Sequence, residues 1–234
     1  MSISENIALV REQIITAAHR VNRRPEEIML MAVSKTFSVE NIREAYTAGL
    51  RLFGESKVQE FSLKIEALKD LPGAEWHMIG HLQTNKANKA AELFSSIDSV
   101  DSLRLAEKLN SSAQQLGKKL AVLIEINVGG EEAKSGIEPG SHELENLLQA
   151  AGRLDHLAIR GLMTVPPFTD DPQGARPFFR KLHEIRDQIL ARRRPSVTMD
   201  VLSMGMSHDF EVAIEEGSTC VRVGTAIFGE RKKL

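Results

Sequence analysis

The chain has 234 residues, of which 42% are hydrophobic and 26% charged, and its formal net charge is -2. This length and composition suit a globular protein with one large core, and the near-neutral charge argues against a general affinity for nucleic acid or anionic membranes. The single cysteine, Cys220, excludes an intramolecular disulfide. Because no long apolar run and no Pro/Gly/Ser-rich linker is present, we expect one cytoplasmic domain spanning residues 1–234.

The first predicted element is an amphipathic helix. Ser2 and Glu5 have the spacing of a capping box, and apolar residues then recur at helical intervals up to Val21. Residues 22–25 interrupt this pattern. We therefore assign residues 1–24 to an N-terminal helical segment and residues 29–229 to the body of the domain.

Eight short apolar runs follow, each separated from the next by a stretch of helical periodicity. Because a helical crossover returns the chain to the same edge of a sheet, this order predicts parallel strands. Eight such units favour a closed (β/α)8 TIM barrel of the α/β class, and an open doubly wound sheet is the alternative. The predicted strands are residues 29–34, 50–53, 75–79, 96–100, 120–128, 157–163, 199–203 and 219–223, and the predicted helices lie near residues 39–45, 58–68, 85–93, 103–109, 143–151, 175–190 and 210–215.

In a closed barrel, functional side chains gather just after the C-terminal ends of the strands. Lys35 directly follows the first predicted strand. A lysine in this position is most often a surface residue whose ammonium group reaches water. Partial burial beside a second cation would instead favour its neutral form, which is the nucleophile that forms an imine with an aldehyde.

The loops after the last two predicted strands have the composition of an anion site. Barrels of this kind often bind phosphate between these loops, near the start of a short helix. The alternative is that the glycines serve turns and that Ser207 caps the helix near Phe210. The candidate phosphate ligands are Ser203, Gly205, Ser207, Gly224 and Thr225.

Arg222 lies inside the eighth apolar run, with parity opposite to Val221 and Val223. It therefore points either into the barrel mouth or toward the helices. A buried arginine needs an acceptor, which is either a core carboxylate such as Glu125 or Asp200 or an atom of a bound ligand. Together, the lysine, the anion site and the arginine indicate a phosphorylated aldehyde, and pyridoxal phosphate is the aldehyde cofactor that fits.

Several blocks of this sequence resemble the pyridoxal-phosphate homeostasis proteins, over nearly the whole chain. The resemblance implies a fold-type III barrel similar to the N-terminal domain of bacterial alanine racemases. It also implies that the protein holds pyridoxal 5'-phosphate as an aldimine on Lys35 and serves vitamin B6 homeostasis, without established catalytic turnover. The blocks are residues 32–36, 53–55, 58–60, 76–86, 134–136, 160–163, 202–207 and 221–229.

The same resemblance implies roles for individual residues. The five hydroxyl and glycine residues of the two loops would bind the phosphate, and Arg222 would face the pyridine nitrogen. Because a guanidinium group does not readily give up its proton, the ring would then be a poor electron sink. Met163 and His81 or Asn85 would line the pocket near the ring. Two residues depart from the family pattern, because Ser56 stands where asparagine is usual and His208 where a small or acidic residue is common.

Other functions remain open. The chief alternative is a pyridoxal-phosphate-dependent amino-acid racemase or lyase, but racemases of this fold take a tyrosine base from a further domain, and the one tyrosine here, Tyr46, lies in the first barrel helix. A class I aldolase would also place a lysine at a strand end. A nucleic-acid binder would depend on Lys86, Lys89 and residues 192–194, although such charge runs are usually solvated helix faces.

A zinc site on His77 and His81 would lack a third ligand, so we expect no metal. We expect a monomer whose ligand is pyridoxal phosphate, with no nucleic-acid or membrane partner. Apoenzymes that depend on this cofactor are the candidate recipients.

Overall fold

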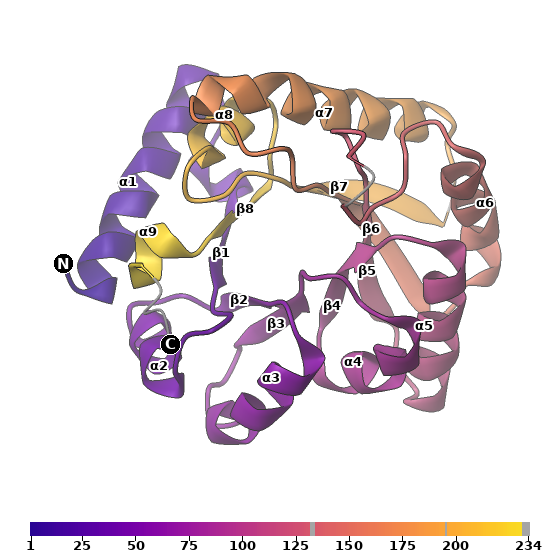
Figure 1. Ribbon diagram of the computed structural model, residues 1–234, viewed down its shortest axis with the longest axis horizontal. Coiled ribbons are helices and arrows are strands. Elements are labelled where there is room, and N and C mark those ends of the chain that lie inside the picture. Colours follow the sequence, from indigo (N-terminus) through magenta and orange to yellow (C-terminus); the bar gives the residue numbers. More distant parts are fainter. Residues whose placement is uncertain (132–133, 195, 231–234) are drawn as a thin grey trace.

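The computed structural model describes residues 1–131, 134–194 and 196–230. Its eight strands are parallel and close into a barrel, because β1 pairs with both β2 and β8. Figure 1 shows β1 and the yellow β8 side by side where the ring closes. The predicted closed barrel is confirmed. The strands are β1 (Met29–Val33), β2 (Leu52–Glu55), β3 (Glu75–Met78), β4 (Ser96–Val100), β5 (Leu120–Glu125), β6 (Leu157–Met163), β7 (Val197–Ser203) and β8 (Cys220–Val223).

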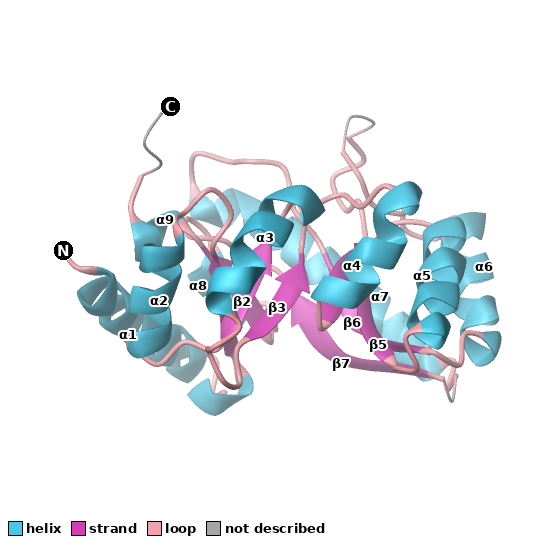
Figure 2. Ribbon diagram, turned by 90° about the horizontal axis from the view of Figure 1, so that it is seen from below, coloured by secondary structure: helices cyan, strands magenta, loops and turns pink. Residues whose placement is uncertain are grey.

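Helices surround the barrel, as Figures 1 and 2 show, and in Figure 2 the longer loops gather above the strands. Most of the helices connect one strand to the next, as the sequence predicts. The α-helices are α1 (Ile3–Arg20), α2 (Val39–Thr47), α3 (Val58–Lys64), α4 (Ala87–Leu93), α5 (Leu103–Gln115), α6 (His142–Ala150), α7 (Arg176–Ala191), α8 (Phe210–Glu215) and α9 (Thr225–Phe228). Short 3-10 helices are η1 (Pro25–Glu27), η2 (Ile65–Leu68), η3 (Thr84–Lys86), η4 (Ala151–Arg153) and η5 (Pro172–Ala175).

The N-terminal helix α1 begins with the capping box that the sequence predicts. Ser2 and Glu5 exchange side-chain and backbone hydrogen bonds, which satisfies two amides that helix geometry leaves free. The helix packs its apolar face against α2, α8 and α9. Asn6 Nδ2 also donates to the carbonyl oxygen of Ile227 at 2.9 Å, so α1 supports the segment that follows β8.

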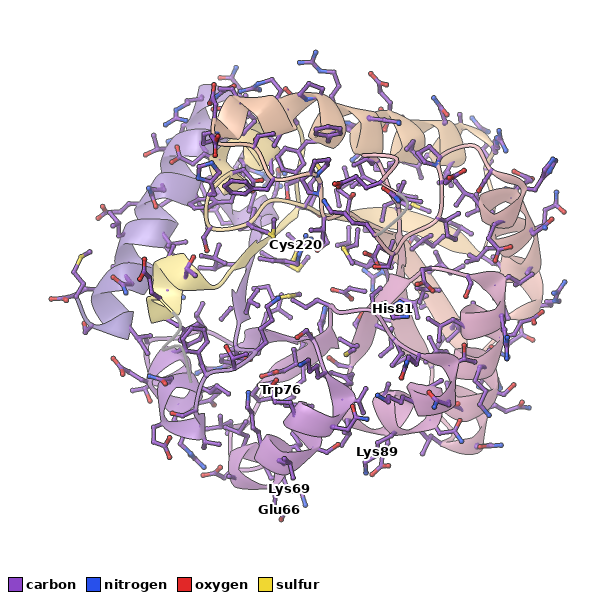
Figure 3. The ribbon with its side chains drawn as sticks, viewed as in Figure 1. Glu66, Lys69, Trp76, His81, Lys89 and Cys220 are labelled. Carbon is purple, nitrogen blue, oxygen red and sulfur yellow. The ribbon has the colours of Figure 1, made fainter. Side chains whose placement is uncertain are left out.

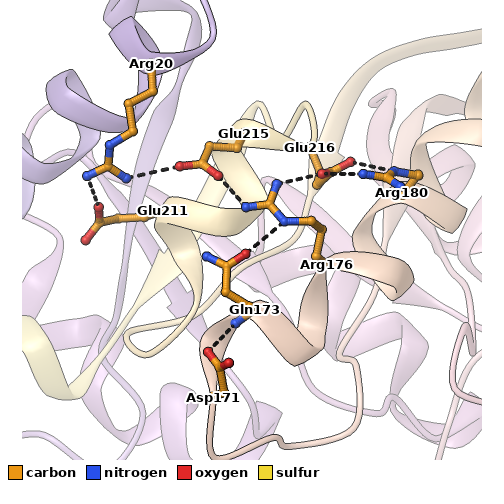
Figure 4. A network of polar contacts seen from close by, with 8 residues as sticks. All are labelled: Arg20, Asp171, Gln173, Arg176, Arg180, Glu211, Glu215 and Glu216. Carbon is orange, nitrogen blue, oxygen red and sulfur yellow. Dashed lines mark hydrogen bonds and ion pairs between the residues drawn. The ribbon is translucent and has the colours of Figure 1, made fainter.

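A group of ion pairs joins α1, α7 and α8 on the outside of the barrel (Figure 4). Arg20 of α1 contacts Glu211 at 2.9 Å and Glu215 at 3.0 Å, and Arg176 of α7 contacts Glu215 and Glu216. Each partly exposed pair stabilises the fold only slightly, but shared partners make a network of fixed geometry. This network holds α8, which directly follows the loop after β7.

The buried apolar side chains form two layers. The main cluster lies between the sheet and the helices and contains Ala32 of β1. Met31 and Val33 are also buried but lie outside that cluster, as do Leu123 and Met163. Since successive side chains of a strand point to opposite faces, Met31 and Val33 point into the barrel, and Lys35 continues the same inward register.

Several elements differ from the sequence prediction; for example, β7 begins at Val197 instead of residue 199, and α5 extends to Gln115. β2 covers Leu52–Glu55 instead of residues 50–53. Gly54 and Glu55 are not apolar strand formers, so the sequence did not indicate them, but both pair with β3. β5 ends at Glu125, and Ile126 instead forms an isolated bridge with Ile137. The short helix α9 was not predicted, because four residues are too few to show helical periodicity.

Gly161 lies where β6 and β7 approach each other closely, so its substitution tests this strand packing. An added Cβ at Gly161 would lie 1.8 Å from the carbonyl oxygen of Val201, and backbone cannot move aside as a side chain can. We expect Gly161→Ala to lower the free energy of unfolding by about 2 kcal/mol or more in urea denaturation. For the control Gly152→Ala, the nearest atom lies 4.0 Å from the added Cβ, and we expect a change within about 0.5 kcal/mol. Equal stability of the two variants would contradict the strand packing.

Candidate functional site

Lys35 lies in the turn that follows β1 and is partly buried. The turn is anchored to β2 because Ser34 N donates to the carbonyl oxygen of Gly54 at 3.0 Å. Ser34 Oγ donates to Glu55 Oε1 at 2.7 Å, and both side chains are fully buried. The lysine therefore extends from a backbone that is fixed on its N-terminal side.

Closure of the barrel brings β8 next to this turn. Ala32 of β1 is paired with Val223 of β8, so Val33 and Gly224 follow side by side. A Cβ on Gly224 would have Val33 as its nearest neighbour, at 3.5 Å. Lys35 is therefore two residues beyond the last contact between the strands, next to the loop that begins at Gly224.

The loops after β7 and β8 meet at the hydroxyl of Ser207. Its Oγ accepts hydrogen bonds from the backbone amides of Gly224 at 3.1 Å and Ala226 at 3.3 Å. The alternative role as a cap of α8 is wrong, because Asp209 is the residue that precedes that helix. Two amides that converge on one oxygen form a geometry that also suits an anion. Thr225 is exposed at the first position of α9 and lies between these two amides in the sequence.

Gly205 is required by the fold itself. Its φ of +92° lies in the region that favours glycine, and an added Cβ would come within 2.5 Å of Ala213 Cβ in α8. Its carbonyl oxygen accepts a hydrogen bond from Arg222 N at 3.0 Å. Gly205 thus brings α8 close to the loop that carries Ser207.

Arg222 points into the barrel and is 3% exposed. Its guanidinium group donates to Ser203 Oγ at 2.8 Å and to the carbonyl oxygen of Thr164 at 2.7 Å. Burial lowers the pKa of Arg222, while the charges of several acidic groups, among them Asp98 and Glu125, act in the opposite direction.

The proposed salt bridge from Arg222 to Glu125 or Asp200 is not formed. Among the ion pairs of the described residues, Asp200 pairs with Arg160 at 3.3 Å, and Arg222 takes part in none. The hydroxyl and carbonyl acceptors hold the guanidinium group in place without neutralising its charge.

The residues predicted to line a pocket near a cofactor ring are spread over several loops. Met163 is fully buried at the end of β6, where its register partner on β7 is Ser203. His81 and Asn85 are exposed in the segment after β3, and His81 Nδ1 lies 2.9 Å from Asp101 Oδ2. Figure 3 shows His81 near the ends of β4 and β5. Ser56 is partly buried, and a Cβ on Gly80 would meet its carbonyl oxygen at 2.4 Å, so the loops after β2 and β3 are in contact.

His208 lies on the outer side of the loop after β7. It is exposed, its Nε2 lies 3.1 Å from the carbonyl oxygen of Asp170, and its ring centroid lies 5.6 Å from that of Phe168. These contacts direct it toward the segment after β6. Ser207, and not His208, therefore makes the contact with the β8 loop.

Sequence reasoning gave no functional role to Glu125, whose side chain lies at the C-terminal end of β5. It is 6% exposed, Ser135 Oγ donates to its Oε1 at 3.1 Å, and its buried Oε2 has no partner. Burial raises the pKa of Glu125, and the charge of Asp101 adds to this effect. The sequence feature that could have indicated a role for Glu125 is its position directly after a strongly apolar run. Glu60 and Lys64 of α3, which contact the Lys35 turn, had no comparable signal.

The remaining candidate groups do not reach this site. His77 Nδ1 pairs with the buried Asp98 at 2.9 Å, and among the described residues no cluster of His, Cys, Asp or Glu could hold a metal ion. The hydroxyl of Tyr46 donates to the carbonyl oxygen of Pro72 at 2.8 Å on the outside of the barrel. Within the basic run, Arg192 and Arg194 both pair with Glu145 of α6.

Comparison with known proteins agrees with this geometry. The family model described as "Alanine racemase, N-terminal domain" matches residues 7–232. A curated protein of Aquifex aeolicus named pyridoxal phosphate homeostasis protein is 47% identical over 99% of this chain and 100% of its own length. The Escherichia coli K12 protein of the same name is 44% identical over 98% of this chain and 97% of its own.

The chain belongs to the pyridoxal phosphate homeostasis protein family. Among solved structures, PipY of Synechococcus elongatus with pyridoxal phosphate bound is 37% identical, with a TM-score of 0.85 over 97% of this chain and 100% of that chain. Alanine racemase of Clostridium difficile has a TM-score of 0.74 but is only 17% identical and is covered over 58% of its length, so it shares the fold. The two curated relatives, from Aquifex aeolicus and Escherichia coli, carry the homeostasis name and not that of an enzyme. None of the described helices of this family member is long and apolar enough to cross a membrane.

Glu125 predicts how the stability of the unliganded protein depends on pH. The pKa of the buried carboxyl group is raised above its ordinary value in the folded state. The folded protein therefore holds this proton more tightly than the unfolded chain, and the stability that this provides is complete at low pH and is lost as the pH rises through the folded-state pKa. We expect Glu125→Gln to lose less stability than wild type in urea denaturation as the pH is raised from about 5 to about 8, because the glutamine has no proton to lose. The exposed Glu26→Gln serves as the control. Parallel curves for wild type and Glu125→Gln would contradict the assignment.

Proposed function

We propose that this protein binds pyridoxal 5'-phosphate covalently on Lys35 and serves the intracellular homeostasis of that cofactor. The observation that carries the proposal is the closure of the barrel between β1 and β8. It brings Val33, two residues before Lys35, beside Gly224, whose amide converges with that of Ala226 on a single oxygen. The pyridoxal phosphate bound to the PipY structure and the name shared by the curated relatives support this reading.

The residues at the barrel mouth fit the chemistry of this cofactor. Its aldehyde condenses reversibly with a primary amine, so that a carbon–nitrogen bond forms and the aldehyde oxygen leaves as water. Lys35 supplies the amine, and the amides of Gly224 and Ala226 supply donors for a phosphate oxygen. Ser207 and Thr225 add hydroxyl groups, and Gly205 shapes their loop.

Arg222 faces the pyridine nitrogen in this proposal, and Ser203 fixes its direction. Ser203 therefore acts on the ring side of the site, in addition to its predicted contact with the phosphate. Met163 lies beside it, and His81, Asn85 and Ser56 line the outer rim. A guanidinium group held by neutral acceptors keeps its proton, so the ring nitrogen stays unprotonated.

The same contacts favour binding over turnover. A substrate carbanion is stabilised best by a protonated ring, and Arg222, which does not readily give up its proton, leaves the ring a poorer electron sink. Tyr46, the only tyrosine in the sequence, is hydrogen-bonded on the outside of the barrel and supplies no second base. We therefore propose a carrier of the cofactor in place of a racemase or lyase.

We further propose that the protein is a cytoplasmic monomer and that apoenzymes needing pyridoxal phosphate are its recipients. A bond between an amine and an aldehyde exchanges readily with a second amine, which is the chemistry that a carrier needs. The near-neutral net charge of -2 gives no general attraction to nucleic acid or anionic membranes.

The cofactor proposal is tested by reduction and mass spectrometry. After incubation with pyridoxal phosphate and treatment with borohydride, we expect one added pyridoxyl group on the peptide that contains Lys35. Lys35→Ala should remove the added mass together with the visible absorbance of the complex, because it removes the amine that is proposed to form the bond. Lys89→Ala, which alters an exposed lysine on α4 (Figure 3), should retain both. Labelling of another lysine in place of Lys35 would contradict the proposal.

A further inference from the structure

We propose that Glu60 and Lys64 of α3, with Glu55 of β2, are positioning residues that fix the direction of Lys35. This inference rests on the proposed function, because it assigns these residues to the site that binds the cofactor. None of the three needs to touch the cofactor. Their effect passes through Ser34 and Thr36, the two neighbours of Lys35 in the sequence.

The first neighbour, Ser34, is fixed by side-chain contacts as well as by its backbone hydrogen bonds, and its Oγ also lies 3.4 Å from the carbonyl oxygen of Gly54. Ser34 Oγ donates to Glu55 Oε1 at 2.7 Å, and the ammonium group of Lys64 lies 3.4 Å from the carbonyl oxygen of Ser34. Both contacts come from the outer side of the barrel, where α3 covers β2. These contacts hold Ser34 in place from the side of the barrel opposite to its interior.

The second neighbour has an unusual backbone conformation. Thr36 has a φ of +69°, in the left-handed region that β-branched residues avoid. Its backbone amide donates to Glu60 Oε1 at 2.7 Å. A strained conformation persists only where its surroundings enforce it, and this hydrogen bond is the contact from α3 that does so.

Lys64 connects the two halves of the arrangement. Its Nζ lies 2.6 Å from Glu60 Oε1 and 3.3 Å from Glu55 Oε1. Burial raises the pKa of Glu55 despite the nearby ammonium group. Glu60 is less buried, and although burial opposes ionisation, its hydrogen bonds with Lys64 and Thr36 lower its pKa. The ionised Glu60 is therefore the main counter-charge for Lys64 and the strongest acceptor for Thr36.

This arrangement predicts an effect on bond formation that is separate from cofactor affinity. A displacement of the lysine by a fraction of an ångström slows attack on the aldehyde, whereas the phosphate and ring contacts come from other strands. Losing Glu60 should thus slow the covalent step. It should leave the binding of a cofactor analogue without an aldehyde nearly unchanged.

The experiment compares two probes, pyridoxal phosphate and 4'-deoxypyridoxine 5'-phosphate, which carries a methyl group in place of the aldehyde. We expect Glu60→Ala to slow the absorbance change of imine formation by about tenfold, while the affinity for the deoxy analogue changes less than about twofold. Glu60→Gln keeps an oxygen acceptor and should recover part of the rate. The control Glu66→Ala removes an exposed glutamate that pairs with Lys69 nearby (Figure 3) and should match wild type.

A second variant tests the strained turn directly. Glycine adopts a φ of +69° without penalty, so Thr36→Gly in the Glu60→Ala background should restore the rate of imine formation to within about threefold of wild type. Failure of the double variant to recover would show that Glu60 does not act through the turn. An equal loss of affinity for both probes would show a general structural role and would also overturn the inference.

A measurement without cofactor separates this inference from the proposed function. Lys35 is methylated with formaldehyde and cyanoborohydride, and the rate is read from its peptide by mass spectrometry. Glu60→Ala should speed this reaction, because a released turn exposes the partly buried amine, while Lys89 should react as in wild type. An unchanged rate at Lys35 would refute the positioning role. If wild type binds neither probe but this rate changes, the proposed function fails and the positioning role stands.

Discussion

The pairing of β1 with β8 is the interaction on which the rest of the site depends. Lys35 and the Gly224 loop lie near opposite ends of the sequence, and only the closed barrel makes them neighbours. The register of this strand pair determines which side chains face the barrel interior. Met31 and Arg222 are paired, and both point inward. A shift of one residue between the strands would put Met31 and Arg222 on opposite faces of the sheet, so that the arginine and Lys35 would no longer share the barrel interior.

The buried polar groups of the barrel sheet, on both of its faces, have few hydrogen-bond partners. Arg222 has a hydroxyl and a carbonyl oxygen as acceptors, and Glu55 and Glu125 each keep one buried oxygen without a partner. Burial also raises the pKa of the Cys220 thiol to about 12, so that group stays neutral beside Arg222. Because a buried charge is costly to leave uncompensated, its geometry is fixed by the few groups that face it. The barrel thus combines a buried guanidinium group with carboxyl groups whose pKa burial raises.

Much of the fold could be predicted because the apolar runs and the helical stretches alternate without ambiguity. The capping box at Ser2 and the eight strands follow from residue spacing, whereas parity left Arg222 pointing either into the barrel or toward the helices. The partners of Arg222 could not be predicted, since Thr164 contributes a backbone oxygen that carries no sequence signal. The contact of Glu60 with the amide of Thr36 and the convergence of two amides on Ser207 could not be predicted either, because they also involve backbone groups.

The most direct test of the account is a crystal structure of the protein grown with pyridoxal phosphate. The account predicts continuous density from Lys35 Nζ to the cofactor, with phosphate oxygens within hydrogen-bond distance of the amides of Gly224 and Ala226. Arg222 should face the ring nitrogen while it retains its contact with Ser203. Cofactor attached to a different lysine, or a phosphate group bound away from the loops after β7 and β8, would contradict the central claim.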